Sequence, residues 1–180
     1  MRKKKIISPM ISSSKKNEFE VLVKANMKRA YFSALGLVGS HDDAMEISQE
    51  AFIRAYRNFD KFDENRKFFT WYYKILNNLC LNFLRDKKKI IAGDFLEFSA
   101  DENISSQPEK IFERKEIAAN IEESLSEISF EDREILILRE FEGLSYKEIS
   151  ELLNVPEGSV MSRLFYARKK LAEKMKRKMK

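Results

Sequence analysis

The sequence predicts an all-α protein made of two small helical domains joined by an acidic linker. In both halves apolar residues recur with the 3.6-residue period of amphipathic helices. Five glycines and three prolines in 180 residues are too few for the turns of a β protein. Between the halves, residues 93–127 carry ten acids against three bases. We therefore expect a helical domain over 15–90, a linker over 91–112 and a second helical domain over 113–176.

The composition narrows the class of protein. A net charge of +5 favours a polyanionic partner. The single cysteine, Cys80, cannot form an internal disulfide, which indicates a reducing, cytoplasmic location. No apolar run reaches membrane-spanning length, so we expect no membrane insertion. The linker acidity has two interpretations: it keeps the linker solvated, or it mimics nucleic acid and occupies a basic channel until displaced.

Residues 143–171 have the pattern of a helix-turn-helix. Ser145 and Glu148 fit a capping box at the start of the first helix, and Pro156 suits the first turn of the second. Four apolar positions of the second helix recur on one face, which must pack inward: Val160, Leu164, Ala167 and Leu171. The remaining face of the motif, about Tyr146 to Phe165, and the basic turn beyond it form a candidate DNA-reading surface: Ser159, Met161, Ser162, Arg163, Phe165, Tyr166, Arg168 and Lys169.

The charge of this segment supports DNA binding. From Gly158 to Lys180 nine lysines and arginines stand against one acid, Glu173. Phosphate contacts would use such a concentrated cationic field. The alternative is an ordinary helical hairpin with a solvated outer face.

In the first half, a helix over about 17–35 is followed by an amphipathic helix over 43–59, for which Asp42 or Asp43 is the expected cap. One side of this second helix is apolar, with Ala44, Ile47, Ala51, Phe52 and Ala55. The other side carries a mixed polar surface: Asp43, Glu46, Gln49, Glu50, Ile53 and Arg54. Ile53 lies among charged residues on this side. It either marks a surface that docks on another protein or is a single exposed aliphatic residue of the ordinary kind.

Nine aromatic residues lie between Phe52 and Tyr73, more than a small core needs, so we expect some rings to be exposed. The next helix, about Phe69 to Arg85, adds an aromatic, amide and cationic stripe: Trp71, Lys74, Asn78, Asn82 and Arg85. Rings stack unpaired bases, amides bond base edges and cations hold the backbone, so this stripe suits a single strand. An equally good interpretation is that Trp71 is part of the hydrophobic core and that Arg85 belongs to a helix end that is simply exposed to solvent.

Three motifs in this order resemble the extracytoplasmic-function (ECF) group of the bacterial sigma-70 family. They are DAMEISQEAFIRAYR at 43–57, FFTWYYKILNNLCLNFLRDKKK at 68–89, and GLSYKEIS with GSVMSRLFYARKKL at 143–150 and 158–171. The resemblance implies promoter-recognition subunits of RNA polymerase, with a region 2 helical bundle and a region 4 helix-turn-helix.

The resemblance also implies roles for these surfaces. The helix with Asp43, Glu46, Gln49, Glu50, Ile53 and Arg54 would dock on core RNA polymerase, whose largest and second-largest subunits are the expected partners. The helix-turn-helix would read the −35 element as duplex. The −10 element would be captured as a melted single strand by Asn65, Lys67, Trp71, Tyr72, Lys74, Asn78, Asn82 and Arg85. An anti-sigma factor is a further expected partner, and no cofactor is expected.

Two residues depart from the family pattern. Related proteins often carry Arg or Lys where Met161 stands and Arg where Tyr166 stands. Because a bidentate arginine reads guanine, the resemblance with these changes predicts a −35 preference shifted from a guanine-rich start.

Two other classes of protein compete with this interpretation. A stand-alone homodimeric helix-turn-helix regulator, dimerising through residues 17–85, explains the C-terminal half equally well but gives no reason for the Gln49–Glu50 helix. An enzyme is not expected. His41 near Asp42, Asp43 and Glu46 superficially suggests a metal site, but capping and a solvated loop explain these residues more simply, so we expect no metal.

Overall fold

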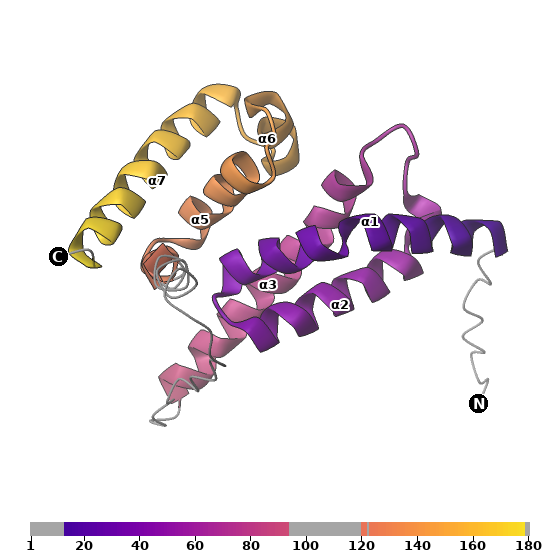
Figure 1. Cartoon of the computed structure of the whole chain (residues 1–180), viewed down its shortest axis with the longest axis horizontal. Helices are drawn as coiled ribbons and strands as arrows, with labels where there is room; N and C mark the ends of the chain where they lie inside the picture. Colours follow the sequence, from indigo (N-terminus) through magenta and orange to yellow (C-terminus); the bar gives the residue numbers. More distant parts are fainter. Residues whose placement is uncertain (1–12, 94–119, 122, 179–180) are drawn as a thin grey trace, which may run out of the picture.

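The computed structural model describes residues 13–93, 120–121 and 123–178 (Figure 1). Its elements are α1 (Ser13–Val38), α2 (His41–Arg57), the 3-10 turn η1 (Phe59–Lys61), α3 (Phe68–Gly93), α5 (Phe130–Leu136), the π-helical turn η2 (Ile137–Phe141), α6 (Tyr146–Leu153) and α7 (Glu157–Lys178). These described ranges contain no strand, and the all-α prediction is confirmed. Residues 94–112, most of the expected linker, lie outside the described ranges.

Helices α1, α2 and α3 pack against one another as an N-terminal bundle (Figure 1). Aromatic rings fill its centre: the Phe19 ring lies 5.0 Å from Phe59 and 6.0 Å from Phe68, both edge-on. The expectation that some of the nine rings between Phe52 and Tyr73 are exposed is wrong, since each is buried or half-buried. Through ring contacts, Phe19 included, they form one connected aromatic cluster that packs beside the aliphatic residues of the core.

The helices of the bundle begin at other residues than predicted. Ser40, not Asp42 or Asp43, is the N-cap of α2, and its hydroxyl accepts from the Asp43 amide at 3.4 Å. The preceding Gly39 has a φ of +72°, which turns the chain sharply out of α1. The two aspartates lie in the first turn, where the helix dipole favours negative charge. Helices α1 and α3 are also longer than predicted at both ends.

The C-terminal module, α5 to α7, is the predicted helix-turn-helix with one preceding helix. The Ser145–Glu148 capping box is present at the start of α6, as predicted. Asn154 ends α6 in the left-handed conformation, with a φ of 53°. Pro156 directly precedes α7, and its carbonyl accepts from the Val160 amide at 3.1 Å. Val160, Leu164 and Ala167 are fully buried on the inner face.

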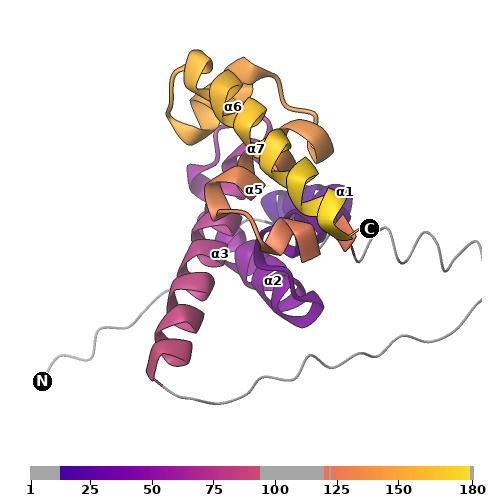
Figure 2. The ribbon, with the colours of Figure 1, turned by 90° about the vertical axis from the view of Figure 1, so that its left-hand side faces the viewer.

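The C-terminal module packs against one end of the bundle, with α5 nearest to it (Figure 1). The view in Figure 2 shows the same grouping from the side. A Cβ atom placed on Gly36 of α1 would come within 2.8 Å of Ile137 Cδ1 in η2, so the two elements touch closely here. Buried residues of both modules therefore belong to one continuous hydrophobic core.

Glu134 of α5 lies at this contact between the modules and is 8% exposed. Burial, followed by the charge of Glu131, raises the pKa of Glu134 to about 7. A hydrogen bond from Asn77 of α3 and the charge of Arg163 act in the opposite direction. Within the described part of the chain its Oε1 has no hydrogen-bond partner, so nothing at that atom offsets the cost of burying the charged form.

Glu134 makes stability depend on pH. Its pKa is higher in the folded chain than its ordinary value of 4.5, so the folded chain binds more protons, and stability falls as pH rises from about 4.5 until it levels off above about 7. Between pH 6 and pH 8 we expect the free energy of unfolding to fall by about 1 kcal/mol from this group, since one pKa unit is worth about 1.4 kcal/mol. Urea denaturation of wild type and Glu134→Gln at both pH values measures it.

In Glu134→Gln the fall in the free energy of unfolding between pH 6 and pH 8 should be absent. The control variant Glu151→Gln, at an exposed acid, should still show it. An identical pH dependence in wild type and Glu134→Gln would contradict the assignment.

Candidate nucleic-acid interface

The outer face of α7 presents three large apolar side chains to solvent. Met161 is 55% exposed, Phe165 63% and Tyr166 58%. Apolar side chains that lie close together on one exposed face mark a possible interaction surface. Of the other residues predicted for this face, Ser159 is half-buried, and four are exposed: Ser162, Arg163, Arg168 and Lys169.

Part of the cationic field on α7 is neutralised within the chain. Arg168 pairs with Glu140 at 2.5 Å, and Lys170 pairs with Asp132 at 2.5 Å. Further along, Lys174 and Lys178 both pair with Glu127 at 2.8 Å, and these bonds lower the pKa of Glu127 to about 2. Among the described residues, acids of the 120–142 region thus offset several of the cations counted from sequence.

The predicted stripe of α3 is exposed on one side of the helix. Lys74, Asn78, Asn82 and Arg85 all reach solvent, and Arg85 Nη2 donates to Asn82 Oδ1 at 3.0 Å. Trp71, at the start of the stripe, is half-buried, with its ring 5.3 Å from Phe62. The stripe therefore has one partly accessible ring followed by amide and cationic groups.

The loop before α3 holds the two remaining residues predicted for this surface. Asn65 and Lys67 are both exposed. Asp63 Oδ1 accepts from the Asn65 backbone amide at 3.0 Å and from its side-chain amide at 3.0 Å, which fixes the loop. Lys67 reaches across to the C-terminal module and pairs with Glu148 of α6 at 2.6 Å.

Tyr72 is the exception, and its assignment to a DNA surface is wrong. Its side chain is fully buried, its hydroxyl donates to the Ser48 carbonyl at 3.1 Å, and its ring stacks on Phe52 at 4.4 Å. Burial raises the pKa of the Tyr72 hydroxyl above its ordinary value. Tyr72 faces α2 and cannot stack on a base.

The predicted polar face of α2 lies on the surface of the bundle. Glu46, Gln49, Ile53 and Arg54 are exposed, with Ile53 47% exposed. Glu50 is half-buried and pairs with Arg54 at 2.7 Å one turn later. Asp43 is half-buried beside Lys87 of α3, whose Nζ lies 3.7 Å from its carboxylate.

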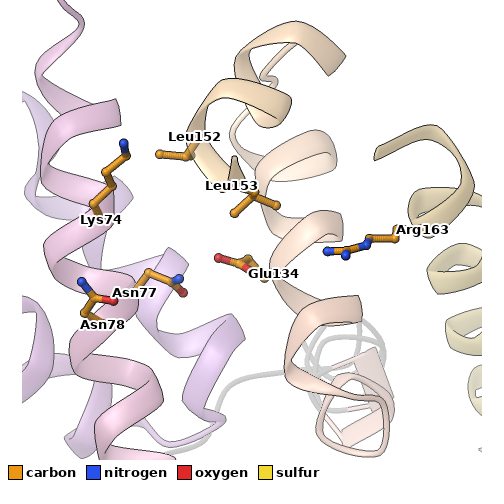
Figure 3. A pocket seen from close by; sticks show the side chains of 7 residues that line it. All are labelled: Lys74, Asn77, Asn78, Glu134, Leu152, Leu153 and Arg163. Atoms are coloured by element: carbon orange, nitrogen blue, oxygen red, sulfur yellow. The ribbon is translucent and has the colours of Figure 1, made fainter. Parts of the chain in front are cut away.

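A cavity of about 370 Å³ lies between α3 and the C-terminal module (Figure 3). On one side Lys74, Asn77 and Asn78 of α3 line it, and in Figure 3 Asn77 and Glu134 point toward one another. The C-terminal module contributes the other side: Glu134, Leu152, Leu153 and Arg163. Sequence analysis missed Asn77 and Glu134, because helical periodicity gives no information on contacts between distant helices.

The histidine that superficially suggested a metal site, and the single cysteine, both have other surroundings. His41 Nδ1 hydrogen-bonds with the Tyr31 hydroxyl at 2.6 Å. Cys80 is fully buried, and burial raises the pKa of its thiol to about 12. Over residues 13–93 and 123–178 no three His, Cys, Asp or Glu side chains gather as metal ligands. None of the described helices is long and apolar enough to cross a membrane.

Comparison with known proteins places both modules in one family. Residues 22–90 match the Sigma-70 region 2 model, and residues 118–171 match the Sigma-70, region 4 model. The chain is 32% identical to the ECF RNA polymerase sigma factor SigW of Bacillus subtilis over 98% of this chain and 97% of that protein. It is 34% identical to the ECF RNA polymerase sigma-E factor of Escherichia coli over 74% of each chain.

Two solved structures share the fold. The sigma factor RpoE of Bartonella quintana, in complex with the anti-sigma factor NepR, matches with a TM-score of 0.72 and 22% identity over 89% of this chain and 98% of that one. CnrH, in complex with the cytosolic domain of CnrY, matches with a TM-score of 0.66 and 22% identity over 88% of this chain and 87% of that one. The chain belongs to the ECF group of RNA polymerase sigma factors, which direct promoter-specific transcription.

Proposed function

We propose that this sigma factor reads the −35 element as duplex with α7 and holds the −10 element as a melted single strand on α3. The observation that carries the proposal is the exposed line of Lys74, Asn78, Asn82 and Arg85 on α3, distant in sequence from the exposed face of α7. Two chemically different surfaces on one chain suit two different forms of DNA. We assign these surfaces to functional segments at 15–90 and 113–176, joined by a linker over 91–112.

On the −35 duplex, α7 would enter the major groove with its exposed face. Met161, Phe165 and Tyr166 offer apolar contacts, which suit the C5-methyl group of thymine better than the edge of guanine. Ser159, Ser162 and Arg163 would add hydrogen bonds to bases or phosphates, and Arg168 and Lys169 would hold the backbone. The expected −35 preference is therefore shifted toward A·T pairs.

On the −10 strand, bases would stack at the half-buried Trp71 and bond to amides. Asn78 and Asn82 lie on the same side of α3 and can pair with base edges, while Lys67, Lys74 and Arg85 neutralise phosphates. Asn65 would contact a flipped base from the loop. Tyr72 supports this surface from within the core and makes no contact with DNA.

Two protein partners complete the proposal. The exposed face of α2, with Glu46, Gln49, Ile53 and Arg54 and the half-buried Asp43 and Glu50, would dock on core polymerase in the cytoplasm. The sigma factor RpoE, which shares the fold, was solved in complex with the anti-sigma factor NepR, and an anti-sigma factor would restrain this chain as well.

The test of this function is run-off transcription with purified core polymerase and a promoter library. We expect start sites that share two elements, with fewer guanines at the upstream one than in other ECF promoters. Light scattering should show a monomer that joins the polymerase. A stable homodimer that binds a palindrome and starts no transcript would favour the helix-turn-helix regulator instead.

Removing one amide from α3 should impair strand capture alone. Asn78→Ala should slow open-complex formation on duplex promoter about tenfold or more, because a base contact of about 1–3 kcal/mol is lost. Permanganate footprinting of melted thymines measures this.

The matched control is a promoter with a premelted −10 region, on which Asn78→Ala should regain much of its activity. Normal melting of the duplex promoter by Asn78→Ala would contradict the role of α3.

Changing the face of α2 should weaken polymerase binding without unfolding the bundle. Gln49→Ala with Glu50→Ala removes two side chains from this face, and we expect at least about a tenfold loss of affinity for core polymerase. Competition binding with a labelled sigma factor measures it. Glu20→Ala, an exposed acid on α1, is the control that should leave affinity unchanged. Equal affinity for both variants would place the docking surface elsewhere.

A further inference from the structure

Arg168 of α7 is paired inside the chain, yet it belongs to the surface that we propose for duplex DNA. Its Nε and Nη2 donate to the same carboxylate oxygen of Glu140 in η2, at 2.9 and 2.5 Å. A guanidinium carries its N–H donors in a planar fork, and the Nη1 amino group of Arg168 is not among the donors to Glu140. Arg168 can therefore keep Glu140 on one edge and bind a second anion on the other.

The pair of Arg168 with Glu140 is open to solvent. The Arg168 side chain is 50% exposed and that of Glu140 is 45% exposed. A pair with this exposure contributes little to folding stability, because water and salt screen both charges. Its main physical effect is to hold a long, flexible side chain in one orientation.

Glu140 is itself held in place, because it lies in a π-helical turn whose inner side is buried. The Glu142 amide donates to the Ile137 carbonyl at 2.9 Å, which is the hydrogen bond that closes this turn. Ile137 and Leu138 are buried, and the Leu144 amide donates to the Leu138 carbonyl at 3.0 Å. Single π-helical turns of this kind are frequent at functional sites.

The second neighbour of Arg168 is Tyr146, at the start of α6. The hydrogen bond to Glu140 is the largest cause that raises the pKa of Arg168, and the Tyr146 hydroxyl adds to it. The guanidinium of Arg139 lies over the Tyr146 ring, 4.9 Å from its centroid, and Arg139 Nη1 donates to the Leu144 carbonyl at 2.8 Å. Arg168 thus lies between two groups that are each held by contacts of their own.

Arg168 is on the same side of α7 as two of the exposed apolar residues. Phe165 precedes it by three positions and Met161 by seven, and residues at these spacings share one side of a helix. A helix that enters the major groove with Met161 and Phe165 brings Arg168 to the edge of the groove, where the phosphates lie.

From these contacts we propose that Glu140 is a positioning residue for DNA binding. It holds one edge of the Arg168 guanidinium, so that the other edge meets a phosphate of the −35 duplex. A fork that is oriented in advance loses less freedom for each hydrogen bond that it forms. This inference rests on the proposed reading of the −35 element by α7.

The sign of one substitution separates positioning from simple neutralisation. If Glu140 only cancelled the charge of Arg168, Glu140→Ala would tighten DNA binding, because an acid near the phosphates is removed. If Glu140 positions Arg168, the same change weakens binding. Glu140→Gln keeps the size and one acceptor oxygen, so its affinity should lie between those of Glu140→Ala and wild type.

The measurement is fluorescence anisotropy of a labelled duplex promoter from the run-off library, bound by holoenzyme that is reconstituted from each variant and core polymerase. We expect about tenfold weaker binding for Arg168→Ala and about threefold to tenfold for Glu140→Ala. Glu151→Ala, at an exposed acid on α6, is the matched control and should bind no more weakly than wild type.

Two further readouts exclude a merely structural role. In an Arg168→Ala background Glu140→Ala should have no further effect, since the two residues act through one contact. Each single variant should also reduce the slope of log affinity against log salt by about 0.9, the value for one phosphate contact. Circular dichroism shows whether each variant keeps its helices, and if Glu140→Ala proves unfolded, Glu140→Gln carries the test.

Equal or tighter binding by Glu140→Ala, with weak binding by Arg168→Ala, overturns this inference and leaves the reading of the duplex by α7 intact. A loss that persists in the Arg168→Ala background also overturns it, because Glu140 would then act through the fold. Failure of the proposed function has a different signature: Arg168→Ala itself would bind the promoter as tightly as wild type.

Discussion

The buried carboxylate of Glu142 is the constraint on which the arrangement of the whole chain depends. A charge that is 4% exposed needs its partners, and both partners, Arg29 and Ser33, belong to the other module. The Arg29 side chain is 37% exposed, so this pair is only partly buried, and removing Arg29 would leave the buried carboxylate with one fewer partner. The hydrophobic core alone is not directional, so this pair, with the Arg133–Leu37 hydrogen bond and the Lys67–Glu148 pair, fixes where the helix-turn-helix sits relative to α1 and α3.

The same arrangement sets a competition between internal acids and DNA. Acids of the chain form ion pairs with cations that DNA phosphates would otherwise contact. These pairs are Glu148 with Lys67, and Glu127 with Lys174 and Lys178. Exposed pairs of this type are weak and are screened by salt, so a polyanion can displace them. The pair of Glu142 with Arg29 is different, because the Glu142 carboxylate is buried between the modules and is also bonded by Ser33.

Features that depend on near neighbours in sequence could be predicted, and features that join distant helices could not. The Ser145–Glu148 capping box, the turn at Asn154 and Pro156, and the buried stripe of Val160, Leu164 and Ala167 follow from spacings of a few residues. Tyr72 was misplaced because its DNA role was taken from the family resemblance, whereas the helical period puts it on the buried side of α3, where it meets Ser48 and Phe52. Glu134 and Glu142 have the sequence pattern of ordinary surface acids, and only the packing of modules about a hundred residues apart buries them. The start of α2 was missed by a few residues because the turn at Gly39 gives the cap to Ser40.

The account is tested most directly by the distance between the two modules in solution. Spin labels on exposed sites of α1 and α7, measured by double electron–electron resonance, report this distance in the free chain and in the complex with core polymerase and promoter. The account predicts one narrow, short distance for the free chain and a longer one in the complex. A broad distribution in the free chain, or the same short distance in both states, would contradict it.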